Sequence, residues 1–115
     1  MVRTRRGTLA EGTTDLAQGF HQEMLGVYER VTAACPGYRP TYFLQMVVDR
    51  GGLDAARALL AQERVSDGFT ELWKRRRLDL SMEALVLQPR WRPLFTTAEL
   101  TEARRRLTEA GYRVT

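Results

Sequence analysis

Apolar residues recur along this chain at intervals of three and four, and no stretch shows the strict alternation typical of a half-buried strand. The longest stripe consists of Leu16, Phe20, Met24, Val27, Tyr28 and Val31. Such a stripe covers one face of a helix and is stable only when other elements bury it. The same spacing returns between successive turn signals. The sequence therefore predicts an all-α fold, a compact orthogonal bundle of five to six helices.

Glycine, proline and capping residues place the expected boundaries. The first helix is expected from Thr14 to the Pro36-Gly37 pair. The last begins at a capping box formed by Thr96 and Glu99 and ends at Gly111. Between them we expect helices from Pro40 to Gly51, from Leu53 to Glu63, from Ser66 through Arg77 and from Ser81 to Pro89, then a connector over 90–95. The apolar face of the helix after Ser66 is expected to consist of Phe69, Leu72 and Trp73.

The length of 115 residues fits one domain and is too short for two. Residues 1–12 are polar and aperiodic, so we expect a flexible N-terminal arm there, with a single helical domain over 13–115. No apolar run approaches the roughly 20 residues that span a bilayer. The N-terminal segment also lacks the apolar core of a secretory signal, so a cytoplasmic location without membrane association is expected.

Few side chains could serve nucleophilic or metal chemistry. Cys35 is the single cysteine and His21 the single histidine, which excludes an internal disulfide, a thiolate zinc cluster and a histidine-rich metal site. About four helical turns separate the two residues, so they cannot meet as a nucleophile–base pair within one helix. We expect no catalytic residue, no metal, no cofactor and no enzymatic activity.

The net charge of +4 is unevenly distributed. Residues 1–36 are neutral in sum, so the whole excess lies in 37–115. Seventeen of the eighteen basic residues are arginine, whose planar fork binds phosphate or carboxylate in a bidentate way. The densest basic blocks are 74–77, 90–92 and 104–106. Arg77 is expected to pair with Asp79 and thus to be structural. The arm adds Arg3, Arg5 and Arg6.

Two interpretations of these blocks stay open. As a contact surface for nucleic acid, the candidates are Lys74, Arg75, Arg76, Arg90, Trp91, Arg92, Arg104 and Arg105. Alternatively, Trp91 anchors the core while its flanking arginines point outward. A second aromatic and basic loop holds Tyr38, Arg39 and Tyr42, which either pack on the end of the bundle or form one side of an interaction groove.

The stretch from Gly37 to Tyr112 carries a series of short motifs. They are Gly37-Tyr38-Arg39, Phe43-Leu44-Gln45-Met46, Gly51-Gly52-Leu53, Ser66-Asp67-Gly68-Phe69, Leu72-Trp73, Arg77-Leu78-Asp79-Leu80, Glu83-Ala84-Leu85-Val86-Leu87 and Leu94-Phe95. This series resembles a family of small bacterial all-helical domains with no established activity. The resemblance implies an accessory module and carries over no catalytic residue.

The favoured hypothesis is a small, non-enzymatic accessory domain that binds nucleic acid, DNA in particular, through its arginine clusters. Such binding would be mostly electrostatic and would weaken steeply with salt. The alternative is a protein interaction module or a small adaptor subunit of a larger bacterial complex, or one that associates with itself. In that case Trp91, Tyr38 and Tyr42 would be the anchors.

Overall fold

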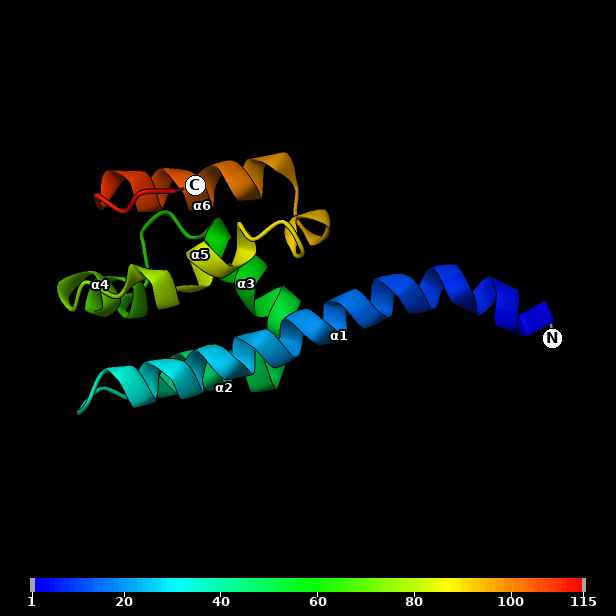
Figure 1. Cartoon of the computed structure of the whole chain (residues 1–115), viewed down its shortest axis with the longest axis horizontal. Coiled ribbons are helices and arrows are strands. Elements are labelled where there is room, and N and C mark those ends of the chain that lie inside the picture. The colour runs from blue at the N-terminus through cyan, green and yellow to red at the C-terminus, as the bar shows by residue number, and fades with distance from the viewer. Residues whose placement is uncertain (1, 115) are drawn as a thin grey trace.

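The computed structural model describes the backbone of residues 2–114 and the side chains of residues 15–114. Within that range it contains six α-helices, two short 3-10 helices and no strand (Figure 1). The predicted all-α bundle is confirmed. α1 (Val2–Ala34) runs along one side of the molecule, α6 (Thr97–Glu109) lies on the opposite side, and the shorter helices fill the space between them.

α1 confirms the predicted apolar stripe, because Phe20, Met24, Val27 and Val31 are all buried. Its start differs from the prediction, since the helix begins at Val2 and not at Thr14. The apolar period reports where a helix packs, and α1 continues beyond its packed face, so that its N-terminal part projects from the bundle (Figure 1). The division into a flexible arm over 1–12 and a domain over 13–115 stays a prediction.

A pair of glycines joins α2 (Thr41–Arg50) to α3 (Gly52–Ala61) in a sharp corner against α1. Gly51 has a φ of 88°, which side chains other than glycine rarely adopt. The backbone N–H of Gly52 donates a hydrogen bond of 2.8 Å to Nδ1 of His21. A Cβ on Gly52 would lie only 2.6 Å from the Cα of His21. The corner therefore depends on both glycines, for different reasons.

Three short helical elements follow: α4 (Asp67–Lys74), the 3-10 helix η1 (Leu78–Leu80) and α5 (Met82–Val86). The two predicted serine caps are present. The Ser66 hydroxyl accepts from the N–H of Phe69, and the Ser81 hydroxyl accepts from the N–H of Ala84. α4 ends at Lys74, earlier than expected, because Arg76 has a φ of 59° that stops the helix.

The predicted connector after α5 holds the second 3-10 helix, η2 (Arg92–Leu94). α6 then begins with the predicted capping box. Its Thr96 hydroxyl accepts from the N–H of Glu99, and the Glu99 carboxylate accepts from the N–H of Thr96. Gly111, with a φ of 88°, follows the end of α6.

The core lies between α1, α3, α5 and α6 and is centred on Phe20 and Leu107, which are fully buried. The ring of Phe20 makes edge contacts with the rings of Trp91 and Phe95, at centroid distances of 5.6 and 5.3 Å. Edge-to-face pairs of this kind add to the stabilisation from burial alone.

Two charged side chains, Arg106 and Glu83, lie inside this core. The Arg106 guanidinium is 2% exposed, and all of its nitrogens donate. Nε donates to Glu102 (2.7 Å), Nη1 to Glu83 (3.1 Å), and Nη2 to the carbonyls of Leu60 (3.2 Å) and Gln62 (2.8 Å). A buried guanidinium is stable only with such complete pairing. Arg106 therefore joins the end of α3, α5 and α6.

Removal of the Arg106 guanidinium should destabilise the protein strongly, because it leaves the buried Glu83 carboxylate without its partner. We expect Arg106→Ala to lower the free energy of unfolding by about 3–5 kcal/mol in urea titrations. The matched control is Arg105→Ala, which removes an exposed partner of the same Glu102 and should lower the free energy of unfolding far less. Equal losses in the two variants would contradict the assigned role.

Because of the Glu102 carboxylate, the free energy of unfolding should depend on pH in the acidic range. Hydrogen bonds from Arg105, then from Arg106, lower its pKa from 4.5 to about 2. A depressed pKa stabilises the folded state above pH 4.5, and this contribution is lost as the pH falls from 4.5 to about 2. Glu102→Gln should therefore be less stable than the native chain at neutral pH, and the difference should vanish near pH 2. Unfolding curves across this range measure it, with Glu109→Gln as a control expected to change little at any pH.

The corner between α2 and α3 gives a third stability test. Gly52→Ala should destabilise the protein by at least about 2 kcal/mol, because the new methyl group would overlap the backbone of α1. Gly68→Ala is the control, since its Cβ would make an ordinary 3.5 Å contact with the Tyr38 hydroxyl. Thermal unfolding monitored by circular dichroism compares the two. A Gly52→Ala variant as stable as Gly68→Ala would show that the close approach is not required.

Candidate nucleic-acid interface

The three basic blocks do not share one face of the molecule. Residues 74–77 begin with the last residue of α4, at the end where α1 and α6 also finish (left in Figure 1). Residues 90–92 lie toward the opposite end, where Trp91 and Arg90 approach Gly19 of α1. Residues 104–106 lie along α6 between these two. A single surface therefore cannot use all of the candidate residues.

Trp91 is a core residue. Its side chain is 2% exposed and packs against Phe20, so it cannot stack on a nucleic-acid base. Of the two interpretations that the sequence left open, the core anchor is correct. Arg90 covers the Trp91 ring from outside at 4.5 Å, and Arg92 donates to the Leu87 carbonyl at 2.7 Å. Both arginines thus already support the local fold.

The block on α6 is largely neutralised. Arg105 pairs with Glu102 at 2.6 Å and with Glu109 at 2.9 Å, and these two carboxylates raise the pKa of its guanidinium. Arg106 is buried, as described above. Arg104 is exposed and makes no ion pair with the described side chains. The run of arginines suggests more free positive charge than α6 presents, because the sequence does not show which carboxylates pair with Arg105 and Arg106.

The block after α4 is part of a larger basic surface, which we call the basic end. It comprises Lys74, Arg75, Arg76 and Arg77, together with two exposed arginines next to residues that the block contacts. Arg39 follows Tyr38, whose ring lies under Arg75, and Arg113 follows Tyr112, which lines a depression with Lys74 and Arg76. The Arg75 guanidinium lies 4.9 Å from the centre of the Tyr38 ring, which joins the block to the loop before α2. Trp73 donates from Nε1 to the Ala110 carbonyl at 3.1 Å, which joins it to the end of α6.

Two carboxylates balance part of this charge. Glu71 accepts from Arg75 and lies 3.8 Å from Lys74, and these cations lower its pKa. Asp79 forms a two-pronged pair with Arg77, each bond 3.0 Å long, so the predicted structural pairing of these residues is present. Arg76 makes no ion pair with the described side chains. The basic end therefore keeps an excess of positive charge in an exposed position.

Trp73 is the residue that the sequence analysis placed wrongly. It was expected on the inner face of α4, but its side chain is 51% exposed. α4 has only eight residues, and Phe69 and Leu72 fill its inward positions, so Trp73 projects sideways. It lines a shallow depression with Lys74, Arg76, Leu78 and residues 110–112. The sequence feature that could have indicated a surface role for Trp73 is its position directly before the basic block 74–77.

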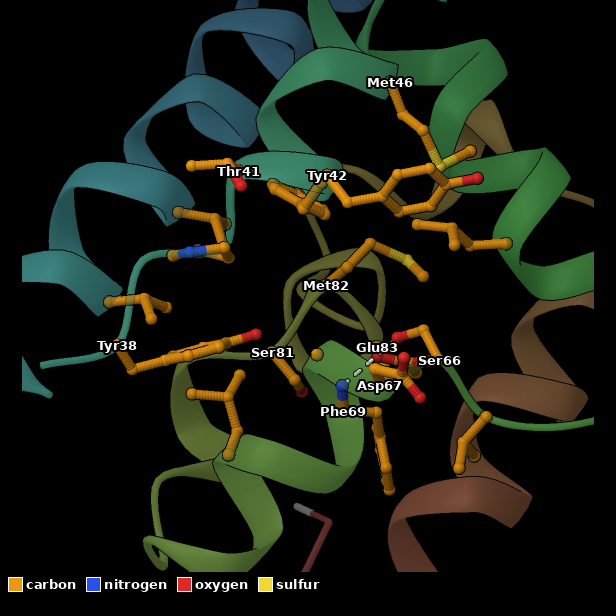
Figure 2. Close-up of a pocket in the computed structure, with 18 of the residues that line it drawn as sticks. Tyr38, Thr41, Tyr42, Met46, Ser66, Asp67, Phe69, Ser81, Met82 and Glu83 are labelled. Carbon is orange, nitrogen blue, oxygen red and sulfur yellow. Dashed lines mark hydrogen bonds between the residues drawn. The ribbon is translucent and has the colours of Figure 1, made fainter.

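The loop candidates Tyr38, Arg39 and Tyr42 line a separate pocket of about 450 Å³ (Figure 2). Tyr38 is half-buried beneath Arg75, and burial is the main cause that raises the pKa of its hydroxyl, followed by the charge of Glu71. Arg39 is exposed, and Tyr42 is 75% exposed at the rim. The loop thus both covers the end of the bundle and forms one side of a pocket.

The two residues suited to nucleophilic chemistry, His21 and Cys35, both contribute to the fold. His21 accepts the Gly52 N–H at Nδ1, and Cys35 is buried at the end of α1. Among the residues described, no group of three or more histidine, cysteine, aspartate or glutamate side chains could hold a metal ion. No helix in the described range is long and apolar enough to cross a membrane.

Comparisons with protein-family models, with curated proteins and with solved structures give no match to this chain. The resemblance of the 37–112 motifs to a bacterial domain family stays a prediction. Function must therefore be inferred from the side chains themselves.

Proposed function

We propose that this chain is a small, non-enzymatic accessory domain that binds nucleic acid through its basic end. The observation that carries the proposal is the half-exposed Trp73 beside Lys74 and Arg76. An exposed indole among cations is the arrangement that binds single strands, with a base stacked on the ring and phosphates on the cations. The cytoplasmic location expected from the sequence belongs to this proposal.

The proposed contact residues differ from the candidates that the sequence suggests. Lys74, Arg75, Arg76 and Arg113 would contact phosphate, and Trp73 takes the stacking role first considered for Trp91. Arg77 stays with Asp79, because a two-pronged ion pair leaves few free donors. A single strand is preferred over a duplex, since the bases of a duplex are already stacked on each other and cannot cover Trp73 without unpairing.

Fluorescence polarisation with a labelled single strand and a labelled duplex, each at about 50 and about 200 mM salt, tests the proposal. Four phosphate contacts predict a log–log salt slope of about −3 for the single strand. The double variant Lys74→Ala/Arg76→Ala should weaken binding about tenfold and reduce the slope by about 1 to 1.5. Arg90→Ala/Arg104→Ala removes the same charge elsewhere and should bind almost as the native chain does.

Equal weakening by the two double variants would mean that only the net charge matters, and no binding at low salt would sink the proposal altogether. Tryptophan fluorescence adds a separate check. Single strands should quench the exposed Trp73, and Trp73→Leu should abolish the quenching, because the buried Trp91 is shielded.

A protein interaction module remains the second candidate. It is favoured by Tyr42, which is 75% exposed beside the pocket, because exposed tyrosines are frequent anchors of protein interfaces. A Tyr42→Ala variant with unchanged nucleic-acid binding but loss of a protein partner in cross-linking would support this candidate over the first.

A further inference from the structure

The pocket of about 450 Å³ is enclosed by four segments that are far apart in the sequence. They are α1, the loop before α2 with the first part of that helix, the stretch from the end of α3 through α4, and the start of α5. Figure 2 shows Tyr38 on one side, Tyr42 and Met46 on another, and Ser66, Asp67 and Glu83 grouped across from Tyr38. The pocket is distinct from the depression beside Trp73.

Its walls are predominantly apolar. Val27, Val31, Leu59, Phe69, Leu72 and Met82 are buried side chains that line it. Met46 is half-buried at the upper rim. Methionine side chains are unbranched and adapt to the shape of what they contact. The volume falls within the range usual for small-molecule sites. It is about three times the roughly 150 Å³ of an apolar cavity that admits one benzene ring.

Both serines in the walls already have hydrogen-bond partners. The Ser66 hydroxyl accepts from Phe69, and the Ser81 hydroxyl donates to Leu78 and accepts from Ala84. Among the lining side chains that are not exposed, the Tyr38 hydroxyl has no hydrogen-bond partner in the described residues, and it points into the pocket in Figure 2. Glu83, which is 2% exposed, is already paired with Arg106 at 3.1 Å.

We propose that this pocket binds an uncharged aromatic molecule of two or three rings that carries an O–H or N–H donor. The ring system would lie against the apolar walls, and the donor would reach the Tyr38 hydroxyl. This ligand site is additional to the nucleic-acid role and does not depend on it.

The charges of the pocket select against anions. Glu83 and Asp67 both line it, and only Arg39 among the lining residues is cationic. A carboxylate or phosphate on the ligand would face a buried Glu83 whose own positive partner, Arg106, is already saturated with four acceptors. A donor on an uncharged ring avoids that repulsion and can pair with the Tyr38 hydroxyl oxygen, which has no partner among the described residues.

Isothermal titration with 2-naphthol and with 2-naphthoate tests the proposal, since the two probes share a ring system and differ in charge and donor. We expect saturable one-to-one binding of 2-naphthol and at least about tenfold weaker binding of 2-naphthoate. Tyr38→Phe keeps the ring beneath Arg75, removes the hydroxyl and should weaken 2-naphthol about two- to tenfold, the range for one hydrogen bond.

A variant that fills the pocket with a larger side chain gives the decisive test. Met46→Trp places a larger side chain at the rim and should reduce 2-naphthol binding at least tenfold. Val48→Trp is the matched control, because Val48 lies on the same helix, is exposed and does not line the pocket. It should bind as the native chain does, and circular dichroism verifies that both variants are folded.

Three results would overturn the proposal: no saturable binding of 2-naphthol, equal binding of 2-naphthoate, or folded Met46→Trp protein that binds like Val48→Trp. The outcome is separable from the nucleic-acid proposal, because Lys74→Ala/Arg76→Ala should leave 2-naphthol binding unchanged.

Discussion

The Arg106 guanidinium holds together the parts of this molecule that lie around its two candidate sites. It donates to Glu83 on α5, to Glu102 on its own helix and to two carbonyls at the end of α3. Burial raises the pKa of Glu83, while Arg106 acts against that rise by stabilising the carboxylate. The ion pair thus places one carboxylate in the wall of the pocket and fixes α6 against α3 and α5.

The position of α6 in turn determines where Trp73 and the basic end lie. The Ala110 carbonyl at the end of α6 accepts from Trp73 and holds the indole in its half-exposed position. Arg75, on the far side of the same short helix, reaches Tyr38 in the loop before α2. A basic surface assembled from three chain segments therefore depends on a buried charge one helical turn before Ala110. Several arginines of this chain thus form hydrogen bonds or stack within the fold, and others are exposed.

Local features of the fold were predictable from the sequence. The serine caps, the capping box of Thr96 and Glu99 and the positive φ of Gly51 each depend on residues within a few positions of one another. The pairing of Arg77 with Asp79 was predictable for the same reason, because the two residues are neighbours in the chain.

Tertiary features were not predictable in the same way. The two tryptophans have the same local character, an apolar ring beside cations, yet Trp91 is buried and Trp73 is exposed. The difference comes from which helix faces lie opposite each ring. Arg106 appears in the sequence as the third member of a surface block, and only the approach of Glu83 from a distant helix makes it a core residue. The pocket likewise needs four segments to come together.

The most direct test of the account is a two-dimensional amide NMR titration of the native chain with a short single-stranded oligonucleotide at low salt. The account predicts shift changes confined to residues 39, 73–77 and 111–113, with the indole N–H signal of Trp73 among the largest. Changes centred on residues 90–92 or 104–105, or spread evenly over the surface, would contradict the assignment of the basic end as the contact surface.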